Sequence, residues 1–245
     1  MTQPELIWII GASDGIGAAL ARAWAERGAR LVLSARSADK LTALARELGD
    51  GHVALPLDVA DRGSLAAAAD QIRQIGTPDR VVHLAAIYDP GQISDLDPEM
   101  AAKIVSVNLT GSFHVAQLAP QVLRAGGQLA MCGSSAGFTG LPQGQIYSAT
   151  KAAVINLTES LRGELAGRID VRLINPGFVE TRLTGRNDFQ MPFLISTEAA
   201  AEAIIKGLNG RRFEVHFPRR MTYLMKLLSA LPYWALLPLT GRLAK

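Results

Sequence analysis

The chain has 245 residues, of which 49% are hydrophobic. That is ample for one core and too little for two comfortable domains. The single cysteine, Cys132, excludes an intramolecular disulfide framework and favours a reducing compartment. The net charge of +3 is uneven, because residues 211–245 have a net charge of +6 and the other 210 residues one of −3. A tail this basic favours an anionic partner or surface.

The first five residues lack the basic and apolar regions of a signal peptide, and no uncharged stretch is apolar enough to span a membrane. We therefore expect a cytoplasmic protein. The four histidines show no metal-ligand spacing. We expect no metal site and no nucleic-acid partner.

Short apolar runs alternate with helical patterns along the chain. Strands are predicted at residues 6–10, 30–34, 52–57, 80–85, 128–132, 170–174 and 212–217. Helices are predicted from the first glycine-rich turn to residue 28, and at 39–48, 64–75, 98–124, 145–165, 197–208 and 221–231. Each strand–helix–strand unit imposes a right-handed crossover, which makes the sheet parallel. We expect an α/β fold with a single domain, a Rossmann-type doubly wound parallel sheet of about seven strands with helices on both faces.

Within this domain, residues 1–210 would form the main body. Residues 211–245 would form the last strand and a basic, apolar tail of the same domain.

A glycine-rich turn follows the first strand. It contains Gly11, Ser13, Gly15, Ile16 and Gly17. Glycines in such a turn let a pyrophosphate approach the backbone at the helix N-terminus, where free N–H groups favour an anion. The alternative is a tight strand–helix turn without a ligand. Because this turn follows the first strand of a doubly wound sheet, we interpret it as a cofactor site.

The end of the second strand indicates which cofactor is bound. An NAD site has an acid there for the ribose 2′-hydroxyl, whereas an NADP site has a cation for the 2′-phosphate. This chain has no acid at that point and has Arg36, whose guanidinium pairs well with phosphate. The sequence therefore favours NADP(H) over NAD. A solvated surface arginine is the alternative reading of Arg36.

Tyr147 and Lys151 are four residues apart in a predicted helix. That spacing places them on one face, with Cβ atoms roughly 5–6 Å apart. A nearby ammonium favours the phenolate, so we expect the pKa of Tyr147 to be lowered. Ser134 lies thirteen residues earlier, after a strand. A surface pair and a turn serine are the alternative reading.

These motifs, in this order, resemble the short-chain dehydrogenase/reductase family over about residues 5–210. Further positions match the family's pattern: Asn108, Asp58 with Val59, and the run Pro176, Gly177, Val179 and Thr181. Two positions depart from it, since Ile10 and Leu84 stand where the family has threonine and asparagine. We expect these two apolar residues to lie side by side at the point where the strand order reverses.

The resemblance implies that residues 1–210 form the dinucleotide-binding and catalytic part of the chain, and it implies roles for the matching residues. Tyr147 would be the general acid in ketone reduction and the base in alcohol oxidation. Lys151 would lower the pKa of Tyr147 and hydrogen-bond the nicotinamide ribose, and Ser134 would hold the carbonyl oxygen. Asn108 would anchor a water that relays protons to Lys151. Asp58 would contact the adenine, and the run from Pro176 to Thr181 would hold the nicotinamide amide. A homodimer or homotetramer is also implied, through helices 98–124 and 145–165.

The expected substrate pocket, at the carboxyl ends of the strands, is apolar. Its predicted residues are Ile87, Tyr88, Phe138, Leu141, Pro142, Phe178 and the segment 189–194. This favours a hydrophobic ketone or aldehyde reduced with NADPH. Two other readings stay open: an NAD-dependent alcohol dehydrogenase and a non-catalytic NADP-binding regulator.

The tail from residue 219 to 245 has two interpretations. Its apolar helix either packs on the substrate pocket or another subunit, or lies in a membrane interface with Arg219, Arg220 and Lys226 at its flanks.

Overall fold

The computed structural model describes residues 4–186 and 190–241. Seven strands form one sheet in the order β3-β2-β1-β4-β5-β6-β7, and every neighbouring pair is parallel. The strands are β1 Leu6–Ile10, β2 Arg30–Ser34, β3 Val53–Ala54, β4 Arg80–His83, β5 Gln128–Cys132, β6 Asp170–Pro176 and β7 Glu214–Phe217. The order reverses between β1 and β4, so the predicted doubly wound parallel sheet is confirmed.

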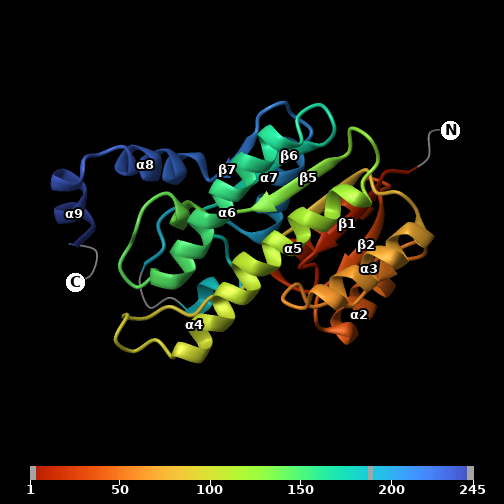
Figure 1. Cartoon of the computed structure of the whole chain (residues 1–245), viewed down its shortest axis with the longest axis horizontal. Coiled ribbons are helices and arrows are strands. Elements are labelled where there is room, and N and C mark those ends of the chain that lie inside the picture. The colour runs from red at the N-terminus through yellow and green to blue at the C-terminus, as the bar shows by residue number, and fades with distance from the viewer. Residues whose placement is uncertain (1–3, 187–189, 242–245) are drawn as a thin grey trace.

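Helices cover both faces of the sheet (Figure 1). They are α1 Gly15–Ala25, α2 Ala38–Leu48, α3 Arg62–Ile75, α4 Pro98–Val105, α5 Gly111–Leu118, α6 Gln145–Glu164, α7 Thr197–Leu208, α8 Arg219–Ser229 and α9 Tyr233–Gly241. Buried side chains of α1, α2 and α7 pack with Ile7, Ile9, Leu31 and Leu33 on one face. Those of α3, α5 and α6 pack with Trp8, Ile10 and Val32 on the other. Successive side chains of β1 and β2 therefore pack into two separate hydrophobic cores, one on each face of the sheet.

Three predicted elements differ from the structure. The strand predicted at 52–57 is reduced to the two residues of β3, although Leu55 N and Leu57 N still donate to Leu33 O and Ala35 O. The nitrogen of Pro56, between these two donors, faces away from β2. The helix predicted at 98–124 is interrupted by a π-helical turn, Ser106–Thr110, and passes into a 3₁₀ turn, Ala119–Gln121, that contains Pro120. The tail forms a second helix, α9, in which Pro238 lies inside the helix.

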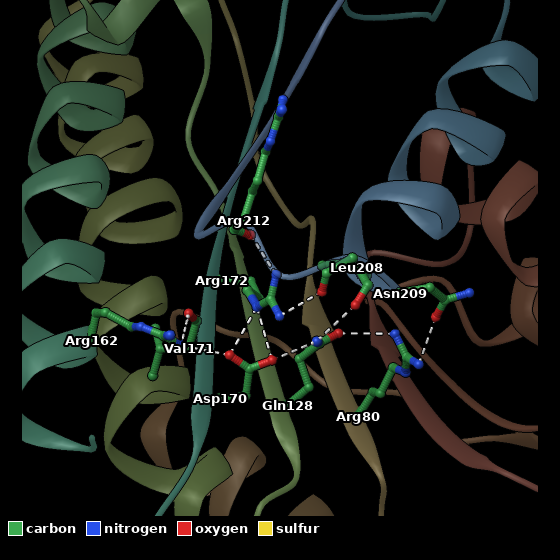
Figure 2. A network of polar contacts seen from close by, with 10 residues as sticks. Arg80, Gln128, Arg162, Asp170, Val171, Arg172, Leu208, Asn209 and Arg212 are labelled. Carbon is green, nitrogen blue, oxygen red and sulfur yellow. Dashed lines mark hydrogen bonds and ion pairs between the residues drawn. The ribbon is translucent and has the colours of Figure 1, made fainter. Parts of the chain in front are cut away.

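The amino ends of the central strands are joined by a polar network (Figure 2). Asp170 accepts hydrogen bonds from Arg172, Arg162 and Gln128. Arg172, which is buried, also donates to the backbone oxygens of Gly210 and Arg212, and Arg80 donates to Gln128 and Asn209. The network joins β4, β5 and β6 to the end of α7. It lies at the amino ends of the strands, and the glycine-rich turn lies at their carboxyl ends.

Candidate active site

The glycine-rich turn between β1 and α1 lies against the segment that follows β4. Gly11 has a φ of +97°, and a Cβ there would lie 2.6 Å from Ala85 N. A Cβ on Gly17 would lie 2.0 Å from Gly11 O. The close packing of the turn therefore requires both glycines, with or without a ligand. Leu84 N donates to Ile10 O at 2.7 Å, which confirms that the two departures from the family pattern are neighbours.

A cavity of about 380 Å³, the larger of two that adjoin each other, lies beside this turn. All fourteen residues predicted to bind the cofactor line it: Gly11, Ser13, Gly15, Ile16, Gly17, Arg36, Asp58, Val59, Tyr147, Lys151, Pro176, Gly177, Val179 and Thr181. It has the N-terminus of α1 along its wall, cations at one end, and Tyr147 with Lys151 at the other. An elongated anionic ligand fits this distribution of charge.

The end of this cavity near β2 contains residues that the sequence reading missed. Ser37 and Lys40 line it together with Arg36. Ser37 is the N-cap of α2, yet its side chain makes no capping hydrogen bond. The Arg36 guanidinium is exposed and makes no hydrogen bond or ion pair with any described residue. The sequence did contain a signal for this site, namely a capping serine, Ser37, followed three residues later by a lysine, Lys40. These three side chains form a site suited to a phosphate.

Asp14 is an acidic side chain that lies beside these cations. Its carboxylate lies 3.4 Å from Lys40 Nζ and 3.6 Å from Arg182 Nε, and it accepts the Gly15 N–H at 2.8 Å. Burial acts to raise the pKa of Asp14, but the Gly15 N–H, Lys40 and Arg182 outweigh it, and the pKa is lowered. Asp14 therefore stays ionised and connects the first turn to the segment after β6.

Tyr147 lies in the first turn of α6, and Ser134 follows β5. The Ser134 hydroxyl accepts from Ala136 N at 3.1 Å, a cap that fixes its position. Burial raises the pKa of Tyr147, and its hydrogen bond with Ser134 only partly opposes this. The expectation of a lowered pKa was therefore wrong for the protein alone. The dominant cause is burial, which disfavours the phenolate and which spacing along a helix cannot reveal.

Lys151 is buried, and its ammonium lies 5.7 Å from the centre of the Tyr147 ring. The Nζ atom donates to Cys132 O at 2.9 Å, which holds the side chain against β5. Burial lowers the pKa of Lys151. Cys132 is a free, buried cysteine at the end of that strand.

Asn108 lies behind the larger cavity and does not line it. Its carboxamide accepts from Ile87 N at 2.8 Å and donates to Ile87 O at 2.9 Å and to Thr150 Oγ1 at 3.3 Å. The π-helical turn places Asn108 where it can join the segment after β4 to α6. In this structure it positions other elements, and none of these hydrogen bonds is made with Lys151.

A smaller cavity, about 130 Å³, adjoins the first. Of the residues predicted for the substrate side, Tyr88, Leu141, Pro142 and Phe178 line it. Ile87 lines the larger cavity instead, while Phe193 and Leu194 are exposed. Phe138 packs beneath Lys226, and Phe189 is outside the described residues.

Two methionines of α8, Met221 and Met225, complete the wall of the smaller cavity. This supports the interpretation in which the tail packs on the substrate pocket, at least for α8. The contact joins residues about eighty positions apart, so no local pattern could have indicated it.

Ser134 and Tyr147 line both cavities. The two hydroxyls therefore stand at the junction between a long, partly cationic cavity and a short, mostly apolar one. Among the described residues, no group of three or more histidines, cysteines, aspartates or glutamates lies close enough together to hold a metal ion.

Comparisons with known proteins agree with this geometry. The family model described as short chain dehydrogenase matches residues 5–191. An uncharacterized oxidoreductase of Myxococcus xanthus is 35% identical over 231 residues, with 91% of each chain covered. 11-beta-hydroxysteroid dehydrogenase A of Arachis hypogaea is 34% identical over 255 residues, covering 91% of this chain and 72% of that protein.

Among solved structures, a short chain dehydrogenase from Burkholderia cenocepacia J2315 in complex with NADP is 27% identical. It matches with a TM-score of 0.84 over 96% of this chain and 98% of that one. The chain belongs to the short-chain dehydrogenase/reductase family of oxidoreductases.

Proposed function

We propose that the protein is an NADP(H)-dependent oxidoreductase that reduces the carbonyl group of a hydrophobic ketone or aldehyde, with Tyr147 as the proton donor. The observation that carries this proposal is the position of Ser134 and Tyr147, which line both cavities at once. A carbonyl in the smaller cavity could present its oxygen to both hydroxyls. Its carbon would then face the larger cavity, where the cofactor would bind.

The two hydroxyls have separate tasks in this reaction. A reduced nicotinamide, when bound, supplies the hydride to the carbonyl carbon. Negative charge then develops on the substrate oxygen, where the Ser134 hydroxyl stabilises it by a hydrogen bond. Tyr147 donates the proton that completes the alcohol. The raised pKa of Tyr147 keeps the phenol protonated at neutral pH, which is the form that can donate a proton.

Lys151 and Asn108 support Tyr147. The Lys151 ammonium, held by Cys132 O, would hydrogen-bond the nicotinamide ribose and attract the phenolate that forms when Tyr147 gives up its proton. For Asn108 we propose the anchoring of a water that relays a proton to Lys151. Its hydrogen bonds to Ile87 and Thr150 fix it close behind the cavity.

The proposed cofactor is NADP(H). Arg36, Ser37 and Lys40 supply two cations and a free hydroxyl for a 2′-phosphate. The Burkholderia relative in complex with NADP supports the same choice. An NAD-dependent alcohol dehydrogenase is the alternative, and the absence of an acid at the end of β2 argues against it.

The proposed substrate is hydrophobic because of the smaller cavity. Leu141, Pro142, Phe178 and the two methionines of α8 give it a mostly apolar wall. A non-catalytic regulator would have no need of Ser134, Tyr147 and Lys151 around one point, so we favour an enzyme.

We also propose a homodimer or homotetramer, and a cytoplasmic protein with a peripheral membrane contact through residues 219–245, of which the structure describes those up to 241. In the described residues no helix is both long and apolar enough to cross a bilayer. The charge of the tail supports contact with an anionic surface.

Consumption of NADPH and of NADH should be measured against a panel of ketones, aldehydes and acyl derivatives. We expect turnover of hydrophobic ketones or aldehydes with NADPH preferred. Preference for NADH would replace the proposal with the alcohol dehydrogenase reading. Tight NADPH binding without turnover of any carbonyl would favour the regulator.

A further inference from the structure

Helix α8 has two apolar faces, and the inner one belongs to the smaller cavity. Met221 and Met225, one turn apart, are buried and line that cavity. Between them, Thr222 Oγ1 lies 2.7 Å from His216 Nδ1 of β7. The ion pair of Lys226 with Glu214 adds a second tie to the same strand. These contacts determine which side of α8 faces the rest of the domain.

Exposed apolar side chains occur on the outer side of α8 and again on α9. Tyr223, Leu224 and Leu227 are exposed on α8, and Leu227 keeps 65% of its surface. On α9 the exposed residues are Tyr233, Trp234, Leu237 and Leu239, and Trp234 is 81% exposed. Seven of the eleven exposed large hydrophobic side chains of the described residues lie on these two helices. We call these seven residues the tail face; apolar exposure gathered in this way marks an interaction site.

The two helices lie at one end of the molecule. Figure 1 shows α8 and α9 beyond β7, at the end opposite α2 and α3. Arg219 and Arg220 are exposed at the start of α8. Residues 219–241 contain Arg219, Arg220 and Lys226 and no acid, a net charge of +3, whereas residues 1–210 have a net charge of −3. A partner for this end should therefore be both apolar and anionic.

An anionic bilayer surface has these properties. Tyrosine and tryptophan are enriched at membrane–water interfaces, and basic residues beside an apolar helix face bind anionic headgroups. α8 has 11 residues and α9 has 9, so neither reaches the roughly 20 residues that span a bilayer. A second copy of the chain fits less well, because two ends with the same positive charge repel.

We propose that the tail face binds the headgroup region of an anionic bilayer, and that the substrate is a lipophilic carbonyl compound dissolved in that bilayer. The second half rests on the proposed function. One helix, α8, forms both the cavity wall and the docking face. Since a helix with its side chains is about 10 Å across, the smaller cavity would lie just outside the lipid surface. A water-insoluble substrate would then reach Tyr147 without crossing bulk water.

The docking half is tested by flotation of the full chain with phosphatidylcholine vesicles, with and without phosphatidylglycerol. Trp234 provides a built-in probe, because Trp8 and Trp24 are buried and Trp234 is exposed. We expect flotation and a blue shift of tryptophan emission with the anionic vesicles only. The variant L224E/L227E keeps Trp234 and should reduce vesicle affinity about tenfold or more.

The control is I93E, which places one glutamate at an exposed apolar residue outside the tail face. It should float like the wild type. Equal flotation of wild type and L224E/L227E, or no flotation at all, would overturn the docking site. A fall in molecular mass of L224E/L227E by light scattering, without vesicle binding by the wild type, would assign the tail face to a second copy and also overturn it.

The substrate half is tested with two probes, 2-tridecanone in anionic vesicles and cyclohexanone in buffer. We expect the ratio of the first rate to the second to fall about tenfold in L224E/L227E and to stay unchanged in I93E. An unchanged ratio in both variants would refute supply from the bilayer. A wild type that floats but reduces neither ketone would contradict the proposed function while leaving the docking site intact.

Discussion

The two ends of the strands, called here the amino edge and the carboxyl edge of the sheet, differ in how their polar side chains are paired. At the amino edge, Arg172 and Asp170 are held in a network whose donors and acceptors serve each other (Figure 2). At the carboxyl edge, Arg36 and the Ser37 hydroxyl have no such partners among the described residues, and Tyr147 and Lys151 are buried at a cost to their charged forms. Removing one partner of a buried charge destabilises the fold, whereas a polar group without a protein partner is available to a ligand. Substitutions at the amino edge should therefore change the stability of the fold. Substitutions at the carboxyl edge should change activity or ligand binding.

The largest effect is expected for Tyr147→Phe. This change removes the proposed proton donor and leaves the ring packed against Tyr88, whose centroid lies 4.7 Å away. Turnover should fall by about 10²- to 10⁴-fold. NADPH binding, measured by fluorescence titration, and the urea midpoint should change little. Turnover near the wild-type rate would remove Tyr147 from the mechanism.

At the other edge, Arg172→Met should mainly affect folding. It leaves Asp170 with one fewer partner and frees the oxygens of Gly210 and Arg212. Because the Arg172 side chain is only 7% exposed, the loss in unfolding free energy should be about 3 kcal/mol. Arg73→Met, which breaks an exposed pair with Asp70, is the control and should cost about 0.5 kcal/mol or less. Urea titration measures both, and equal losses would show that burial is not the cause.

Arg36→Leu should change the binding of NADPH and leave that of NADH as it is. The loss of a guanidinium that would pair with the 2′-phosphate should weaken NADPH binding by about 10- to 100-fold and leave NADH binding unchanged. Arg46→Leu, on the same helix α2 as Lys40 but away from the cavity, is the matched control. If both variants bind NADPH like the wild type, Arg36 is a solvated surface residue.

The smallest expected effect is a pH dependence of the stability that Asp170 contributes at the amino edge. Burial raises the pKa of Asp170, but Arg172, Gln128 and Arg162 outweigh it and lower the pKa from 3.8 to about 2. A carboxyl with a lowered pKa contributes stability above its unfolded pKa and loses it as the pH falls through the folded value. The stability gap between wild type and Asp170→Asn, measured in urea, should shrink from about pH 5 down to pH 2. A gap independent of pH would mean that charge is not what Asp170 contributes.

The sequence predicted what depends on local pattern. Apolar runs such as 6–10 located the strands, and the glycine-rich turn and the Tyr147–Lys151 spacing located the site. It missed what depends on packing: the π-helical turn around Asn108 and the early end of β3. It gave packing of the tail helix on the pocket only as one of two alternatives, and it did not identify Met221 and Met225 as the residues in the cavity wall. The sign of the Tyr147 pKa shift was missed for the same reason, because burial is decided by residues distant in the chain.

The shortness of β3 has a consequence for how copies of the chain can associate. A long outer strand offers unpaired backbone groups on which a foreign strand can dock. Here that border of the sheet has two residues, followed shortly by Pro56, which cannot donate. Strand-to-strand growth is blocked on that side, which protects against fibrous aggregation and directs self-association there to side-chain surfaces.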